Sequence, residues 1–114
     1  EMAMIYDSFT ITAAITAEML GLAKPGEGHL LWKDGHAAPG GRFPINTNGG
    51  GLSFNHSGMY GMPLLIEAYR QLSGTAEDGV HGDPGKQTSA RTCVVNGTGG
   101  HLSTTGTLVL VADD

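Results

Sequence analysis

The sequence contains a single cysteine, Cys93, and this scarcity excludes several kinds of protein. One thiol cannot form an internal disulfide, so the chain lacks the disulfide framework of small secreted domains. The five histidines show no His-x-x-x-His spacing and have no second cysteine beside them, so we expect no metal site. A lone cysteine fits a reducing compartment, and we therefore expect a cytoplasmic protein.

Basic residues are also few. Six Lys and Arg against eleven Asp and Glu give a net charge of −5, and the basic residues are scattered along the chain. Without a basic stripe to neutralise phosphates, we expect no nucleic-acid partner. No apolar run approaches the roughly 20 residues that a membrane-spanning helix needs, so we expect no membrane partner.

The chain is rich in glycine and otherwise ordinary. Its 114 residues, 39% of them hydrophobic, suit one globular domain over residues 1–114. Nineteen glycines are far more than the usual share of about 7%, which predicts many tight turns or close backbone approaches. The chain opens with "EMAMIYD". This stretch has no initiator methionine and resembles the end of a β-strand. We therefore expect it to be part of a longer protein.

The hydrophobic periodicity alternates between helix-like and strand-like segments, which favours an α/β layer architecture. The expected elements are a helix over 7–22, an extended or turning segment over 45–54, a helix over 57–72, and strands over 91–97 and 105–112. The proline- and glycine-rich stretch between the first two is expected to be irregular.

Local signals refine these elements. Asp7 or Ser8 is expected to cap the first helix, and a short hairpin is expected around Asp34-Gly35. The apolar face predicted for the second helix consists of Met62, Leu65, Ile66 and Tyr69.

The stretch "NTNGGGLSFNHSGMYGM" combines three consecutive glycines with an isolated histidine, His56, just before a helix. A neutral imidazole there can act as a base or a hydrogen-bond donor near pH 7. A surface histidine that caps the helix is the alternative that composition alone favours. Asn46, at the start of the stretch, is expected to order the glycine turn through local side-chain hydrogen bonds.

The same stretch resembles the thiolase segment N-x-x-G-G-A-I-A-L-G-H-P-x-G-x-S-G. The matching positions are Asn46, Gly49, Gly50, His56, Gly58 and Gly61. Upstream, "YDSF" lies where thiolases carry N-E-A-F and the sterol carrier protein x-type branch carries H-D-C-F. Downstream, "VVNGTGGHLSTTGTLVL" is similar to the glycine-rich strand–turn–strand that ends the thiolase fold.

The resemblance implies that the chain is the C-terminal half of a thiolase-like fold, a layered αβα structure with a mixed sheet. Such a half is normally paired with a similar N-terminal half. It also implies a homodimer, with an accessory acyl-CoA-binding subunit as a further partner, and a coenzyme A thioester as substrate with no cofactor. The family's acyl-accepting cysteine belongs to the N-terminal half, so Cys93 is expected to be a buried, inert thiol.

Site residues follow from the matching positions. The histidine that matches His56 activates the nucleophilic cysteine in thiolases and binds the thioester oxygen, so His56 is the first catalytic candidate. Tyr6 is the second. The expected substrate-binding residues are Gly49, Gly50, Asn46, Gly99 and Ser8. Tyr60 is expected to pack against the other half rather than to line the site.

The chain departs from thiolases at the second catalytic group. Ser8 replaces the cysteine of H-D-C-F, and Asn96 aligns with the cysteine of the C-terminal C-x-G motif. Neither can act as a thiolate base. Thiolase-like aldolases of steroid side-chain breakdown resemble the chain in having tyrosine at the position of Tyr6, although they tend to have tyrosine where His56 lies.

Three functions therefore stay open. The first is a thiolase-like acyltransferase that makes or breaks C–C bonds of 3-ketoacyl-CoA thioesters, which leads narrowly because His56 is retained. The second is retro-aldol cleavage of 3-hydroxyacyl-CoA, because Tyr6 is present and the base cysteine is not. The third is a non-catalytic thiolase-like subunit.

Overall fold

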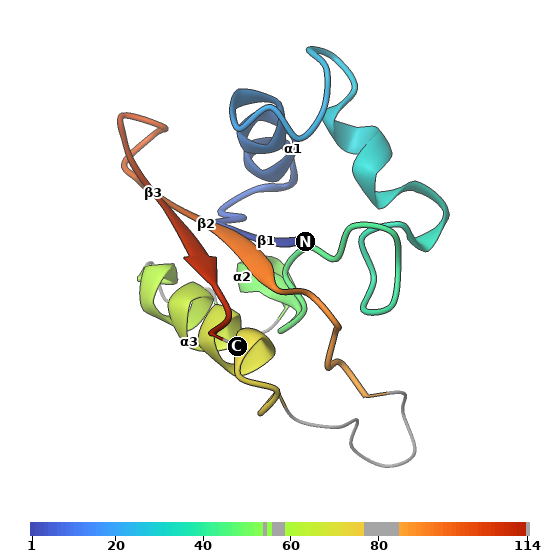
Figure 1. Cartoon of the computed structure of the whole chain (residues 1–114). Helices are drawn as coiled ribbons and strands as arrows, with labels where there is room; N and C mark the ends of the chain where they lie inside the picture. The colour runs from blue at the N-terminus through green and yellow to red at the C-terminus, as the bar shows by residue number, and fades with distance from the viewer. Residues whose placement is uncertain (54, 56–58, 77–84, 114) are drawn as a thin grey trace.

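The computed structural model describes residues 1–53, 55, 59–76 and 85–113. A three-stranded sheet lies at its centre, in the order β1 (Met2–Ile5), β2 (Thr92–Gly99) and β3 (Thr104–Val111). β1 runs parallel to β2, and β3 runs antiparallel to β2, so the sheet is mixed as the sequence predicts (Figure 1). The strand expected at the start of the chain is confirmed as β1.

Helices cover both faces of this sheet. On one face lie α1 (Thr10–Met19) and the 3-10 segment η1 (Gly28–Gly35), and on the other lies α3 (Gly61–Leu72), preceded by the single turn α2 (Gly50–Ser53) (Figure 1). The layered α/β architecture predicted from the sequence is confirmed.

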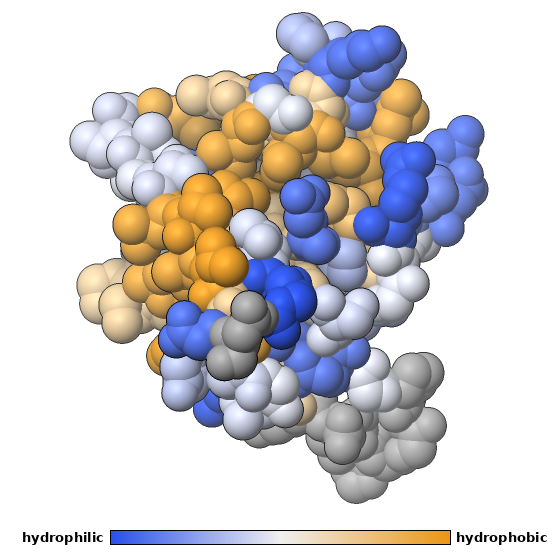
Figure 2. Space-filling view, viewed as in Figure 1, coloured by the Kyte–Doolittle hydropathy of each residue, from blue (hydrophilic) through white to orange (hydrophobic). Residues whose placement is uncertain are grey.

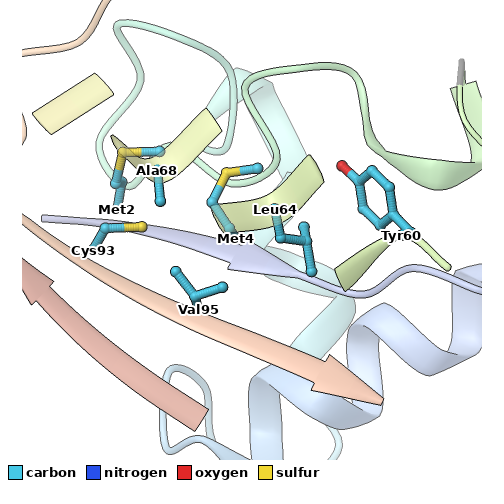
Figure 3. Close-up of a cluster of buried hydrophobic side chains, with 7 residues drawn as sticks. All are labelled: Met2, Met4, Tyr60, Leu64, Ala68, Cys93 and Val95. Atoms are coloured by element: carbon cyan, nitrogen blue, oxygen red, sulfur yellow. The ribbon is translucent and has the colours of Figure 1, made fainter. Parts of the chain in front are cut away.

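The side chains of β1 alternate between these two layers, because successive residues of a strand point to opposite faces. Met2 and Met4 pack with α3, and Ala3 and Ile5 pack on the side of α1 and η1. Figure 3 shows the first cluster, in which Met2 and Met4 lie between the sheet and α3. The same alternation determines where Tyr6 and Asp7, which follow β1, project.

α1 begins later than the sequence predicts. Its N-cap is Phe9, which makes no side-chain capping bond, so the expected cap by Asp7 or Ser8 is wrong. The carboxylate of Asp7 instead accepts backbone N–H groups more than forty residues away, at Gly51. The buried face of α1 consists of small residues, which lets the helix approach the sheet closely: Thr12, Ala13, Thr16 and Ala17.

The hairpin expected around Asp34-Gly35 is also wrong. Both residues take the positive φ that a tight hairpin turn uses, but they end the 3-10 segment η1. The flanking residues carry no alternating pattern with which two strands could pair, and this explains the difference.

α3 buries a different face from the expected one. Its buried residues are Leu64, Glu67, Ala68 and Gln71. Of the expected face, Leu65 packs partly buried against the core, whereas Met62, Ile66 and Tyr69 are exposed. Glu67 and Gln71 can be buried because distant groups satisfy their hydrogen bonds, as Thr47 and Lys86 do for Glu67. Three large apolar residues of α3, Met62, Ile66 and Tyr69, therefore face away from this chain's own core.

β3 is an exposed strand at the edge of the sheet. Leu108, Val109 and Val111 are each more than half exposed. Figure 2 shows apolar atoms gathered in the part of the surface where β3 lies. Among the described residues, no helix combines the length and apolarity that crossing a membrane requires.

Candidate functional site

Tyr6 extends the parallel pairing of β1 by one residue, since its backbone N–H donates to the carbonyl of Asn96 at 3.0 Å. By the alternation of the strand, its side chain projects to the α3 face. There its ring meets the ring of Tyr60 edge-on, with centroids 5.6 Å apart and planes at 80°. The backbone N–H of Tyr60 donates to the Tyr6 hydroxyl oxygen at 3.4 Å. The phenol is thus held at the start of α3.

A pocket of about 250 Å³ opens beside Tyr6. Apart from Tyr6, the described residues that line it are all glycine or threonine, from the start of α3 and the facing ends of β2 and β3: Gly61, Gly97, Thr98, Gly99, Thr104, Thr105 and Gly106. The structure therefore brings together two residues expected at the site, Tyr6 and Gly99. Among the lining residues that the structure describes, Tyr6 alone carries a titratable side chain.

Within the described residues, the Tyr6 hydroxyl oxygen accepts from the Tyr60 amide but its own O–H donates to no acceptor. A phenol in this state can still donate its proton to an oxygen that enters the pocket. This arrangement suits stabilisation of an oxyanion, because a hydrogen-bond donor is fixed in advance where charge develops.

The glycine turn behind Tyr6 is held by two side chains. The carboxylate of Asp7 accepts the N–H of Gly51 at 2.6 Å and that of Leu52 at 3.2 Å. Asn48 Oδ1 accepts the N–H of Gly50 at 3.0 Å. Gly50 has a φ of +78°, and a Cβ at this position would overlap the Asp7 carboxylate, so the turn requires glycine there.

Tyr60 joins this turn to Tyr6. Its ring is 1% exposed, and its hydroxyl donates to Asn48 Oδ1 at 2.7 Å. Burial raises the pKa of Tyr60 well above its ordinary value, and the hydrogen bond to Asn48 opposes this only in part. Tyr60 therefore stays a neutral phenol. It packs in this chain's own core (Figure 3), so the expectation that it packs against the other half is wrong.

Asn46 is engaged in the sheet. Its Oδ1 accepts the N–H of Ile5 at 2.7 Å and its Nδ2 donates to the carbonyl of Ile5 at 2.8 Å. The local side-chain bonds expected for Asn46 are thus replaced by bonds to a residue 41 positions away. Asn48 orders the turn instead, and its bond to the N–H two residues on is the Asx-turn that an Asn-Gly-Gly sequence favours.

The remaining substrate-binding candidates lie apart from the Tyr6 pocket. Asn46 and Gly49 line a larger cavity of about 620 Å³, bounded mainly by residues of α1 and η1 and by the stretch around Ala37. Ser8 donates to the Thr12 hydroxyl at 3.1 Å, within the start of α1. Gly50 lies in the glycine turn that Asp7 and Asn48 hold. Whether Asn46, Gly49, Gly50 or Ser8 contacts a substrate stays a prediction.

Asn96 does not take the place of a catalytic cysteine beside Tyr6. Its Nδ2 donates to the hydroxyls of Thr105 at 2.9 Å and Thr107 at 2.7 Å, and it lines a groove with residues of α1. The neighbouring Gly97 lines the Tyr6 pocket instead.

Cys93 is a structural residue. It is fully buried among Met2, Met4 and Val95, as Figure 3 shows, and burial raises the pKa of its thiol to about 12. A thiol in this state is neither a nucleophile nor a base at neutral pH, as the sequence predicts. In the described part of the chain, no group of three or more His, Cys, Asp or Glu side chains could hold a metal ion.

His56 lies outside the described residues, and its catalytic role stays a prediction from the sequence motif. Sequence reasoning missed Asp7 and Asn48 as the residues that hold the glycine turn. The Asx-turn signal could have identified Asn48. Nothing local could have identified Asp7, because its partners lie more than forty residues away.

Comparisons with known proteins show the family of this chain. Residues 1–112 match the family model described as "Thiolase C-terminal domain-like". The chain is similar to 17-hydroxy-3-oxo-4-pregnene-20-carboxyl-CoA lyase of Mycobacterium tuberculosis, with 41% identity over 80 residues, which cover 70% of this chain and 20% of the relative. It is also similar to a steroid side-chain-cleaving aldolase of Thermomonospora curvata, with 37% identity over 111 residues, covering 97% of this chain and 26% of the relative.

A third relative is the benzoylsuccinyl-CoA thiolase subunit BbsB of Thauera aromatica, which is 35% identical over 69 residues, or 60% of this chain and 18% of the relative. The chain thus spans about a quarter or less of the length of each of these relatives. Since the family match extends over almost the whole sequence, the chain belongs to the thiolase C-terminal domain-like family.

Proposed function

We propose that this chain is the C-terminal catalytic segment of an enzyme that cleaves the C–C bond of 3-hydroxyacyl-CoA thioesters by a retro-aldol reaction. The observation that carries this proposal is the position of Tyr6, whose hydroxyl lies at a glycine-lined pocket with its own proton free to be donated, among the described residues. Two relatives that are named as a lyase and an aldolase support the same choice.

The reaction needs a base and an oxyanion donor but no nucleophile. The base removes the proton of the 3-hydroxyl group, the C–O bond becomes a carbonyl, and the bond between the 2- and 3-carbons breaks. Its electron pair moves onto the thioester as an enolate, which is then protonated at the 2-carbon. The products are a carbonyl compound and a shortened acyl-CoA, and no cofactor is required.

Tyr6 is assigned to the enolate oxygen, because its hydroxyl already accepts the Tyr60 N–H and keeps its proton available for donation. His56 is assigned to the 3-hydroxyl proton, since a neutral imidazole is a suitable base near pH 7. This second assignment comes from the sequence motif. Cys93 has no part in the reaction because it is buried in the core.

The test is an assay of the intact protein with 3-hydroxyacyl-CoA and, in parallel, with 3-ketoacyl-CoA plus free coenzyme A. Cleavage of the hydroxyacyl thioester without added coenzyme A is expected. Tyr6→Phe keeps the ring contact with Tyr60 and removes the donor, so kcat should fall by roughly 10²–10³. Tyr69→Phe is the matched control, because it also removes one phenol hydroxyl, on α3 but outside the lining of the Tyr6 pocket, and should leave kcat unchanged.

Acyl transfer of the thiolase type is the second candidate, favoured by the relative that is named as a thiolase subunit and by the retained His56. Thiolysis of 3-ketoacyl-CoA that survives Tyr6→Phe and disappears in His56→Ala would establish this candidate and contradict the retro-aldol proposal. Absence of both activities in the intact protein would favour a non-catalytic subunit.

The proposal extends to partners. Several large apolar residues are exposed in this chain: Met62, Ile66 and Tyr69 on α3, Ile11 and Met19 on α1, and Phe9 at the N-cap of α1. Such faces suit contact with further protein. We assign the α3 face to a thiolase-like N-terminal half, and include a homodimer, an accessory acyl-CoA-binding subunit and a cytoplasmic location in the same proposal.

A further inference from the structure

Two glycines face each other across the β2–β3 ladder beside Tyr6. Gly97 and Gly106 are direct partners in the antiparallel register. Gly97 shares the face of β2 from which Cys93 and Val95 point toward α3, by the alternation of the strand. Both line the Tyr6 pocket, and Gly61, the first residue of α3, lines it from the other side. The part of the pocket wall that these three glycines supply therefore has no side chains.

The chain's own structure does not require glycine at Gly97 and Gly106. Neither has a positive φ, and a Cβ at either position would meet no atom of the described chain within 4 Å. The contrast with Gly99 is clear, because a Cβ there would come within 2.6 Å of the Thr104 hydroxyl. Glycine inside a strand is less stable than alanine, and it often marks a place where a ligand approaches the backbone.

We propose that Gly97 and Gly106 determine substrate size: they leave room beside Tyr6 for the substituents of the carbon that carries the 3-hydroxyl. This inference rests on the proposed function, because Tyr6 must act next to the bond that breaks. A substrate with a bulky group at that carbon needs the empty volume. A linear 3-hydroxyacyl thioester does not.

The experiment uses the intact protein and the variants Gly97→Ala and Gly106→Ala. Two substrates are compared, 3-hydroxybutyryl-CoA and (1-hydroxycyclohexyl)acetyl-CoA, which place a small and a large group at the reacting carbon. In the variants, kcat/KM for the cyclohexyl substrate should fall by roughly 10–100-fold, the effect of one methyl group in a fitted pocket. The value for the linear substrate should change less than about twofold.

Val109→Ile is the matched control. It also adds one carbon to β3, but Val109 pairs with Val94, whose side chain packs on the α1 side of the sheet, away from the pocket. This variant should leave both substrates unaffected. The melting temperature of each alanine variant should not fall below the wild-type value, because the added methyl meets no atom of the described chain.

A second measurement separates this inference from the proposed function. Binding of the unreactive thioesters butyryl-CoA and cyclohexylacetyl-CoA is measured by calorimetry. If the wild-type protein binds both but cleaves neither hydroxy substrate, the retro-aldol proposal fails, and selective loss of cyclohexylacetyl-CoA binding in the variants still supports size selection. Three results would overturn the inference. They are equal weakening of the binding of both thioesters, no binding of either thioester, and a lowered melting temperature, which would show that protein fills the space.

Discussion

The rings of Tyr6 and Tyr60 meet edge to face, with 5.6 Å between their centroids, and the backbone N–H of Tyr60 donates to the Tyr6 hydroxyl. Tyr60 in turn donates its own hydroxyl to Asn48, which holds the N–H of Gly50. The position of the candidate catalytic phenol is thus coupled to the conformation of the glycine turn through one buried side chain.

Removing this coupling should change catalysis more than substrate binding. Tyr60→Phe keeps the ring contact and deletes the donor to Asn48, which should cost roughly 0.5–1.5 kcal/mol in the free energy of unfolding. Since the turn then loses one of its supports, kcat for the proposed cleavage should fall while KM stays close to the wild-type value. Urea unfolding and steady-state kinetics measure the two effects. A variant with unchanged kcat would show that the turn does not depend on Tyr60.

The carboxylate of Asp7 should be essential to the turn. Asp7→Ala leaves the N–H groups of Gly51 and Leu52 without their acceptor and should cost roughly 2–3 kcal/mol in the free energy of unfolding. Asp7→Asn keeps one acceptor oxygen and should fall between Asp7→Ala and the wild type. Asp113→Ala, at an exposed carboxylate, is the control in the same chemical denaturation experiment. Equal stability of all three variants would contradict the assignment.

Glu67 should make the stability of the fold sensitive to acid. Burial alone would raise the pKa of Glu67, but hydrogen bonds from Lys86, Gln71 and Thr47 together hold the pKa below its ordinary value of about 4.5. A lowered folded-state pKa means that Glu67 stabilises the fold above the unfolded pKa. This contribution is lost as the pH falls through the folded-state value.

Glu67→Gln should therefore lower the melting temperature at pH 7 and flatten its decline below about pH 4.5. Glu27→Gln, at an exposed position, should leave the profile unchanged. A profile in which the Glu67 variant declines as steeply as the wild type would show that other carboxylates cause the acid sensitivity.

Cys93 should not react with thiol reagents in the native protein. Because burial raises its pKa to about 12, almost no thiolate exists at pH 8, and the side chain is also inaccessible. Ellman's reagent should find no reactive thiol at this position until the protein is denatured. Cys93→Ala should keep the catalytic rate while losing some stability from the cavity it leaves. Rapid native labelling at Cys93 would contradict this.

The apolar face of α3 should drive association of the isolated 114-residue chain. Met62, Ile66 and Tyr69 are exposed together on this helix, at 63%, 47% and 69%. Light scattering should find dimers or larger aggregates. The double variant Met62→Lys/Ile66→Lys should reduce association without lowering stability, since neither side chain contributes to the core. A monomeric wild-type chain would contradict the prediction.

The sequence predicted the parts of this fold that depend on neighbouring residues. The alternation in β2 and β3 and the helical periods of α1 and α3 are local signals, and so is the apolar setting of Cys93. Sequence reasoning failed where a partner lies far away in the chain. Asp7 was expected to cap α1 but holds the turn at Gly51, and Glu67 is buried because Lys86 neutralises it.

The same limit applies to the candidate site. Tyr6 was identified by its match to a motif, and the structure places it at a pocket with Gly99. Asn96 was aligned with a catalytic cysteine by position alone, and its side chain points to the other face of the sheet because strand side chains alternate. Shifting the alignment by one residue moves the matched position to the opposite face of the strand. The alignment therefore could not decide between Asn96 and Gly97.

The pairing of Asn46 with Ile5 has a consequence for how the sequence can vary. The side-chain amide of Asn46 supplies the donor and acceptor of a peptide group, so the chain stays attached to β1 while its backbone turns away with a φ of +51°. The start of the glycine turn is therefore anchored to the strand that precedes Tyr6. Aspartate at this position would set an acceptor against the Ile5 carbonyl, and alanine would remove both bonds. The distance between the turn and Tyr6 thus depends on an asparagine at position 46.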